Sequence, residues 1–202
     1  EEVYYYYAYS HFCVGDYYLA NYYFKNFSKT YPTSKYAEEC LFMAAMCSNN
    51  LSPKSSLDQT DTRAAMNEFQ LFMDRYPESE LKDSCNTMIS NLRDKLEVKA
   101  FDIAQLYVST EKYKAAVISL TNYLKEYPGS EFKEESMFLM VKANYLYAEG
   151  SIETKKLDRY EDTIESYLNF VANFPEGQNV KKAEGYYLES LKEKEKLLAK
   201  TK

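Results

Sequence analysis

The sequence predicts an all-α protein, an α-solenoid of about four helix pairs with insertions, one long helix and a C-terminal capping helix. Four of the five prolines close the same recurring unit, and these prolines lie 45, 51 and 47 residues apart. Such regular repetition is typical of arrays in which neighbouring units bury one another's apolar faces. Five Gly and five Pro in 202 residues are few for the turns of a β protein, so composition also favours helices.

The recurring unit is a helix that carries a small residue and two large ones at set distances before its proline. Before Pro128 the small residue is Ala116, while Leu120 and Tyr123 supply the bulk and Tyr113 begins the unit. A small side chain lets two helices approach closely, large ones fill the gap, and proline ends the helix. The corresponding residues are Ala20, Phe24, Phe27 and Tyr17 before Pro32; Ala65, Phe69, Phe72 and Thr62 before Pro77; and Thr163, Tyr167, Phe170 and Tyr160 before Pro175.

In the first half of the chain, helices are predicted over residues 1–14, 17–31, 34–48 and 61–76. Gly15 stops the first helix, and Pro32 closes the second because proline cannot continue the hydrogen-bond ladder. A polar loop follows the third helix over 51–60. Asp61 or Thr62 is predicted to cap the fourth helix, since its side-chain oxygen can accept a bond from an unpaired backbone amide.

In the second half, the stretch 79–109 contains neither Gly nor Pro, and its apolar or small residues recur every three or four positions. This spacing predicts one long helix, or two joined by a bend. A helix is predicted from Ser130 to near Gly150, followed by a polar insertion over 151–158. A further helix ends at Pro175, and the last one runs from about Asn179 to Ala199.

The chain is predicted to form a single domain over 1–202. Its repeats are expected over about 1–32, 33–77, 78–128 and 129–175, with the capping helix over 179–199. Ser34, Ser79 and Ser130 each follow a proline by two residues, where a serine is well placed as an N-cap.

The charge and the hydropathy of the chain exclude several classes of protein. A net charge of -6 argues against a nucleic-acid-binding protein, which normally carries a basic stripe. No apolar run approaches the roughly 18 residues that a membrane-spanning helix needs. The chain begins inside a helical pattern at Glu1 and lacks a signal peptide, which predicts a trimmed fragment.

Little in the sequence suggests catalysis. His11 is the only histidine, and its position predicts a role in helix packing or at the rim of the core. The four cysteines contain no CxxC pair. Cys40 and Cys85 occupy a position where the other repeats have Ser or Ala, so they are expected to be buried thiols, with a Cys40–Cys85 bridge as the alternative. We predict no enzyme activity, no cofactor and no metal site.

The small and large residues before each proline, and the helix that precedes them, resemble the tetratricopeptide repeat. The repeats here are longer than the roughly 34 residues of a simple array. The stretch 57–69 (Leu-Asp-Gln-Thr-Asp-Thr-Arg-Ala-Ala-Met-Asn-Glu-Phe) and the stretch 75–79 (Arg-Tyr-Pro-Glu-Ser) resemble the BamD family, the lipoprotein component of the outer-membrane β-barrel assembly machine. The tyrosine-rich composition resembles that of Bacteroidetes-type members of the family.

This resemblance implies a non-catalytic scaffold on the periplasmic face of the outer membrane. The implied partners are the periplasmic domains of the BamA-type barrel subunit, nascent outer-membrane proteins and other lipoproteins of the complex. The resemblance also implies a lipidated cysteine and a first repeat ahead of this chain, which would then be a soluble fragment that meets the membrane only through the absent lipid anchor. The last repeats and the C-terminal helix would hold the barrel subunit, and the first repeats would receive nascent proteins.

The sequence also predicts which residues meet a partner. In a solenoid of helix pairs, the first helix of each pair lines the concave side, and positions beside its packing face become the lining. This lining is aromatic and aliphatic, with few charges. It consists of Tyr5, Tyr9 and Phe12; Leu41 and Ala45; Phe101, Gln105 and Val108; and Met137, Val141 and Tyr145.

Two other functions are weighed against this scaffold. One is a different periplasmic repeat adaptor of cell division or envelope biogenesis, which would usually keep short, uninterrupted repeats. The other is a cytosolic peptide receptor, which would bind acidic C-termini through Lys and Asn in its groove. The insertions argue against the first alternative, and the shortage of cations in the lining argues against the second.

Overall fold

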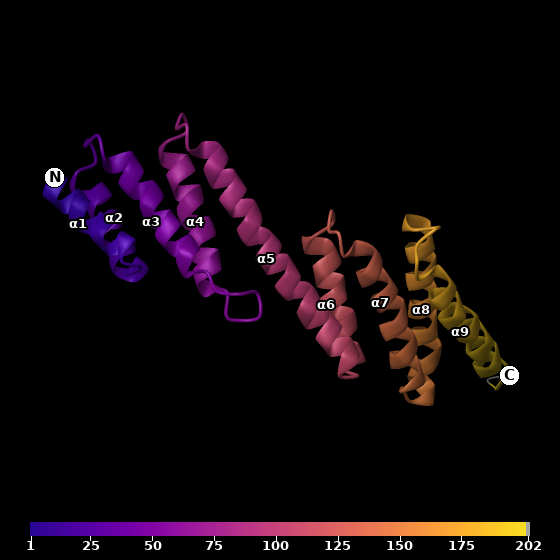
Figure 1. The fold of residues 1–202 in the computed structure, drawn as a ribbon. Coiled ribbons are helices and arrows are strands. Elements are labelled where there is room, and N and C mark those ends of the chain that lie inside the picture. Colours follow the sequence, from indigo (N-terminus) through magenta and orange to yellow (C-terminus); the bar gives the residue numbers. More distant parts are fainter. Residues whose placement is uncertain (201–202) are drawn as a thin grey trace. The chain divides into compact units, whose positions relative to one another are not determined.

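The computed structural model describes residues 1–200, which form nine α-helices and no strand (Figure 1). The all-α prediction is therefore confirmed for this part of the chain. The helices are α1 (Glu2–Cys13), α2 (Tyr17–Thr30), α3 (Ala37–Leu51), α4 (Thr60–Arg75), α5 (Lys82–Ser109), α6 (Tyr113–Glu126), α7 (Lys133–Glu149), α8 (Glu153–Asn173) and α9 (Val180–Lys200).

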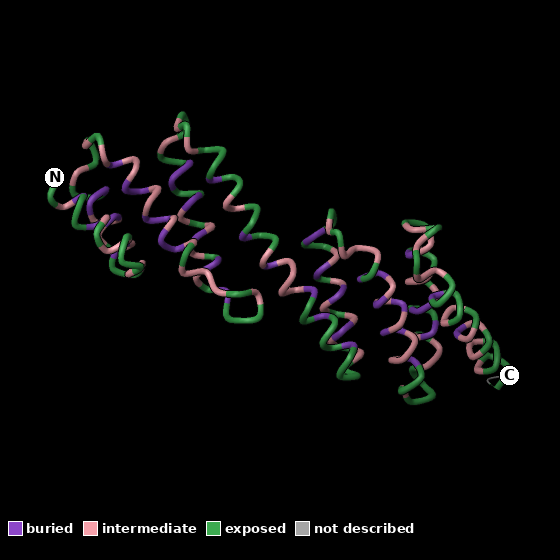
Figure 2. The backbone as a smooth tube through the Cα atoms, in the orientation of Figure 1, coloured by how far each residue is buried: buried purple, intermediate pink, exposed green. Residues whose placement is uncertain are grey.

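The helices fall into two compact units, Glu1–Leu96 and a second unit that begins at Glu97. In the first unit α1, α2, α3 and α4 pack one on the next, and in the second α6, α7, α8 and α9 do the same. This packing between consecutive helices is consistent with a tetratricopeptide-like solenoid. Buried stretches alternate with exposed ones along each helix, as expected for amphipathic helices (Figure 2).

The core of the first unit is built on the residues that precede its prolines. Ala20, Phe24 and Phe27 of α2 are fully buried and pack against Ala8 of α1 and Cys40 of α3. The small alanines allow the helices to approach, and the phenylalanines fill the space between them. The same arrangement recurs before the next proline, with Ala65, Phe69 and Phe72.

In α6 the second unit repeats this pattern with a leucine and a tyrosine in place of the two phenylalanines. Ala116, Leu120 and Tyr123 of α6 are buried in one cluster. The Tyr123 hydroxyl donates to Glu97 Oε1 at 3.1 Å, and its oxygen lies 2.5 Å from Ser130 Oγ. Burying this phenol is therefore accompanied by polar partners for its hydroxyl group.

The prediction that the three serines after the prolines are N-caps is wrong, because Tyr36 and Phe132 stand at the N-cap positions of α3 and α7 and make no side-chain cap. Each serine instead accepts a backbone amide in the turn before the helix. Ser34 Oγ accepts from the amide of Tyr36 at 3.3 Å, and Ser130 Oγ accepts from that of Phe132 at 2.9 Å. Ser79 Oγ accepts from the amide of Leu81 at 3.1 Å. The helices begin three residues after each serine, so the serines order the turn before the helix rather than its first turn.

Two further sequence predictions about helix starts need correction. The polar insertion over 151–158 is mostly helical, because α8 begins at Glu153. Glu153 suits the positive end of the helix dipole, and the Lys and Leu residues that follow are good helix formers. Capping of α4 by Asp61 or Thr62 is wrong, because the helix begins at Thr60 and the Thr62 hydroxyl instead donates to Gln59 Oε1 at 2.7 Å.

Three other expectations about local structure agree with the structure. The stretch predicted over 79–109 contains one long helix, α5, which runs from Lys82 to Ser109 without a break. Gly15 ends α1 with a positive φ of 82°, a conformation that favours glycine. His11 stacks on the Tyr23 ring with 5.2 Å between ring centroids, which places it at the rim of the core. Among the described residues, no helix is long and apolar enough to span a membrane.

The four cysteines are free thiols. Cys40, Cys47 and Cys85 are buried, and burial raises the pKa of the first two thiols to about 12 and that of Cys85 to about 11. Since the thiolate is the nucleophile, these side chains are unreactive near neutral pH and act as small core residues.

Candidate functional site

Two of the predicted lining residues meet on one carboxylate in the first unit. The Tyr5 hydroxyl donates to Glu39 Oε2 at 2.9 Å, and the Tyr9 hydroxyl donates to Glu39 Oε1 at 2.5 Å. Tyr5 also stacks on Tyr36, with ring centroids 4.3 Å apart. These contacts join α1 to α3, so the two tyrosines already serve the packing of the first helices of two pairs.

Burial dominates the electrostatics of this cluster. Desolvation raises the pKa of Tyr5 to about 12, and the hydrogen bond and negative charge of Glu39 add to the shift. The pKa of Tyr9 is raised further, by burial first and then by the same carboxylate. Both phenols therefore keep their protons at neutral pH and donate charge-assisted hydrogen bonds to the Glu39 carboxylate.

The other predicted lining residues of the first unit differ in exposure. Phe12 is half-buried and meets the Tyr17 ring edge-on, with centroids 5.4 Å apart. Leu41 is 8% exposed and Ala45 is fully buried, both in the core that includes Phe69. Phe12 and Tyr9 thus keep surface at the edge of the core, whereas the α3 residues do not.

In the second unit, the predicted lining residues of α5 alternate between core and surface. Phe101 is 6% exposed and stacks on Phe132, with ring centroids 4.6 Å apart. Val108 is also buried. Gln105 is exposed, and its Nε2 donates to Glu135 Oε1 at 3.4 Å.

The predicted lining residues of α7 follow the same division. Met137 and Val141 are buried against Phe170. Tyr145 is half-buried, with its ring centroid 5.0 Å from that of Tyr186. Its pKa is raised, by burial first and then by a hydrogen bond to Glu149. Contact with a partner remains a prediction for all these residues, and the best-exposed of them are Tyr9, Phe12, Gln105 and Tyr145.

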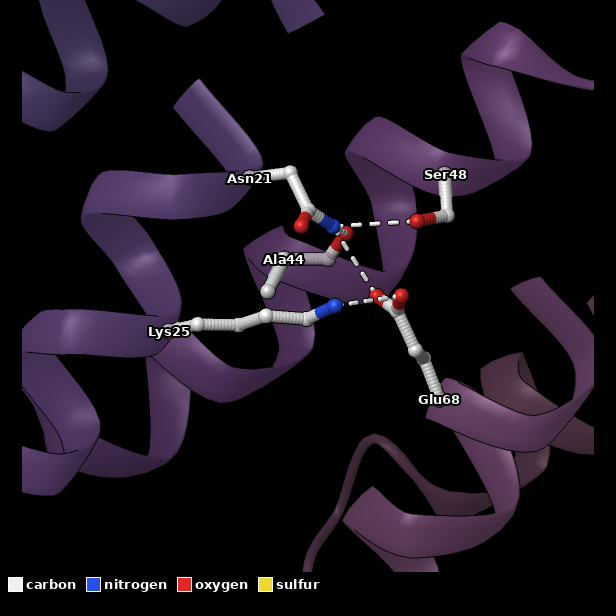
Figure 3. A network of polar contacts seen from close by, with 5 residues as sticks. All are labelled: Asn21, Lys25, Ala44, Ser48 and Glu68. Carbon is white, nitrogen blue, oxygen red and sulfur yellow. Dashed lines mark hydrogen bonds and ion pairs between the residues drawn. The ribbon is translucent and has the colours of Figure 1, made fainter. Parts of the chain in front are cut away.

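A polar network on the other helices of the first unit was not anticipated from the sequence (Figure 3). Lys25 Nζ of α2 lies 2.6 Å from Glu68 Oε1 of α4. Asn21 Nδ2 lies 3.0 Å from Glu68 Oε2 and within 2.9 Å of both the Ala44 carbonyl and Ser48 Oγ of α3. The network therefore ties together α2, α3 and α4, which belong to two successive repeats.

Loss of the Lys25–Glu68 ion pair is expected to loosen the contact between the two repeats. We predict that Glu68→Ala lowers the free energy of unfolding by about 1–2 kcal/mol, because Asn21 and Lys25 both lose their carboxylate acceptor. In a double-mutant cycle with Lys25→Met, the coupling is expected to be about 1 kcal/mol, limited by the partial exposure of the lysine. Urea unfolding of the four proteins measures it, and strictly additive effects would contradict the prediction.

A set of exposed aromatic side chains on α1 and α2 was also missed. Tyr6, Tyr18 and Tyr22 are 63%, 66% and 58% exposed. They lie off the stripe that packs on neighbouring helices, so helical spacing measured from the buried positions would have identified them. Tyrosines offer a large contact area with a polar end and are enriched at protein interfaces.

Within residues 1–200, no three His, Cys, Asp or Glu side chains gather as a metal site. The interactions described above hold helices together, and the exposed tyrosines of α1 and α2 add aromatic surface. A protein-family model described as YfiO, outer membrane lipoprotein, matches residues 1–157 of the chain. A search of curated proteins found no match.

Proposed function

The chain belongs to the YfiO family of outer membrane lipoproteins, and from this premise we propose that it is a non-enzymatic scaffold for assembling β-barrel proteins in the outer membrane. The family match over residues 1–157 is the observation that carries the proposal. The resemblance to the BamD family supports the finer assignment. The proposed partners are the periplasmic domains of the BamA-type barrel subunit, nascent outer-membrane proteins and other lipoproteins of the complex. A lipid anchor would hold the scaffold at the periplasmic face of the membrane.

The first unit is proposed to receive nascent outer-membrane proteins. Exposed aromatic side chains support this proposal. Tyr6, Tyr18 and Tyr22 are exposed, and Tyr9 and Phe12 are partly exposed at the edge of the core. Aromatic side chains bury a large area at a small cost in side-chain entropy, so they suit the binding of unfolded, aromatic-rich segments.

The second unit is proposed to hold the barrel subunit. Three leucines of its last two helices are exposed: Leu168 (55%), Leu188 (56%) and Leu198 (45%). Full burial of an exposed leucine contributes roughly 1.5–3 kcal/mol, so covering one of these half-exposed side chains contributes about half of that. Gln105 and Tyr145 are proposed as further contacts, since both retain exposed surface.

The proposal is tested by capture of the barrel subunit's purified periplasmic domains on the immobilised chain. We expect the chain to retain them and Leu188→Glu to weaken retention by about tenfold, because a charge would be buried in an apolar contact. Leu71→Glu on α4 is the matched control, since Leu71 is equally exposed at 56% and lies in the first unit. Failure of the unmodified chain to retain the periplasmic domains would reject the scaffold function.

A further inference from the structure

A pocket of about 550 Å³ in the second unit is lined by residues of α6, α7 and α8. It has both polar and apolar walls, and two carboxylates, Asp162 and Glu165, line it. The other residues that matter here are Val117 and Thr121 from α6, Met140 and Asn144 from α7, and Ser166 from α8.

This pocket occupies the place that the Asn21–Lys25–Glu68 network occupies in the first unit. Thr121 stands seven residues before Pro128, as Lys25 stands seven before Pro32. Ser166 likewise stands nine residues before Pro175, as Glu68 stands nine before Pro77. Val117 and Asn21 likewise stand eleven residues before their prolines. Counted forward from Pro128 and Pro32, Met140 is equivalent to Ala44 and Asn144 to Ser48.

The two sites differ in what fills the space between the helices. In the first unit the Lys25 side chain crosses from α2 to α4 and places its ammonium 2.6 Å from Glu68 (Figure 3). In the second unit the Thr121 hydroxyl turns back to the Val117 carbonyl of its own helix at 2.8 Å. The Ser166 hydroxyl likewise donates to the Asp162 carbonyl at 2.8 Å. Neither Thr121 nor Ser166 fills the space that Lys25 fills in the first unit, and this open space is the pocket.

The open pocket is rich in hydrogen-bond acceptors and negative charge. Asn144 is only 6% exposed, and its Nδ2 donates to Ser166 Oγ at 2.7 Å. Its side-chain carbonyl accepts no hydrogen bond from the described part of the chain. Lys125 is the only cation in the lining, and it is exposed and forms no ion pair with any residue in 1–200.

Repulsion among carboxylates adds to the excess of negative charge in the pocket. The pKa of Asp162 is raised by burial first, and then by the negative charges of Glu165, Asp158 and Glu161, while Arg159 opposes the shift. A cation beside Asp162 would relieve this repulsion. The Val117 and Met140 side chains offer an apolar wall at the same place, which suits the methylene stem of a lysine.

We propose that this pocket receives a lysine side chain from an extended segment of a partner protein, with its ammonium group between Asp162 and the Asn144 carbonyl. In the first unit Lys25 fills the space between the helices with its own side chain, and in the second unit the partner's lysine fills the equivalent space. The inference goes beyond the proposed function, because it concerns the chemistry of the pocket whichever protein carries the lysine. Failure to bind a lysine peptide would reject it and leave capture of the barrel subunit untouched.

The experiment is a titration of the methyl-labelled chain, followed by NMR, with the blocked peptide acetyl-Leu-Lys-Leu-amide. We expect saturable shifts at the Met140 methyl and the Asn144 side-chain amide. The same peptide with norleucine in place of lysine is expected to bind about tenfold more weakly, because it lacks the charge. Equal binding of the two peptides, or the absence of saturable shifts, would overturn the proposal.

Two variants locate the site. Thr121→Lys should fill the pocket from within, as Lys25 does, and reduce peptide affinity by about tenfold. Asn122→Lys adds the same charge at the next position of α6, where the side chain is exposed, and should leave affinity unchanged. Asp162→Asn, an exposed substitution that keeps the shape of the side chain, should also weaken binding. If Thr121→Lys and Asp162→Asn bind the peptide as the unmodified chain does, the site is elsewhere.

Discussion

Replacement of Phe69 by alanine is expected to lower the free energy of unfolding of the first unit by about 3–5 kcal/mol. Phe69 stands eight residues before Pro77, at the large position of the recurring unit, and is fully buried. It packs in one cluster with Leu41, Phe72 and Leu92, and its ring centroid lies 6.2 Å from that of Phe42. Truncation removes the apolar surface and leaves a cavity that the surrounding helices can only partly close.

The size of this effect matters because a domain is typically stable by only about 5–15 kcal/mol. Urea unfolding followed by circular dichroism measures it. Leu71→Ala is the control on the same helix, since Leu71 is 56% exposed and its truncation should change stability by no more than about 0.5 kcal/mol. Similar losses for both variants would show that the position before the proline has no special part in packing.

Alkaline pH is expected to destabilise the fold through its buried tyrosines. Burial raises the pKa of Tyr5 and of Tyr123 to about 12, and Glu39 and Glu97 respectively add to this shift. An unfolded tyrosine ionises near pH 10. Between about pH 10 and 12 the unfolded state has therefore lost protons that the folded state keeps, so the free energy of unfolding falls as pH rises.

Ionisation of each of these tyrosines is expected to lower the free energy of unfolding by about 2 kcal/mol between pH 10 and 12. Below pH 10 the stabilisation from both tyrosines is fully present. Urea unfolding at a series of pH values, with the phenolate absorbance as a second readout, measures the effect. Tyr5→Phe should make the free energy of unfolding depend less on pH, because phenylalanine has no proton to lose in either the folded or the unfolded state. A stability that stays constant between pH 10 and 12 would contradict the prediction.

The helices could be predicted from the sequence because a proline marks where a helix ends and a small residue marks where two helices pack closely. Each boundary near Pro32 or Pro128 follows from the missing amide and restricted φ of proline. The insertion at 151–158 was harder, because polar residues such as Glu153 and Lys155 suit both a loop and an exposed helix turn. Only contacts with neighbouring helices decide between these two states.

The candidate site was less predictable, because it depends on how side chains cross between helices. Spacing placed Tyr5 and Phe101 beside the packing face of their helices, yet both are largely buried between neighbours. The Lys25–Glu68 pair joins residues 43 apart in sequence, and nothing local marks them as partners. The pocket beside Asn144 becomes apparent once equivalent positions of two repeats are compared, which requires both the register and the structure.

The most direct test of the scaffold function is calorimetric titration of the chain with the periplasmic domains of the barrel subunit. We predict saturable binding with one partner per chain and a dissociation constant of about 1 μM or tighter, as expected for a specific protein interface. No binding heat at protein concentrations of about 100 μM, at two temperatures, would contradict the proposed scaffold function.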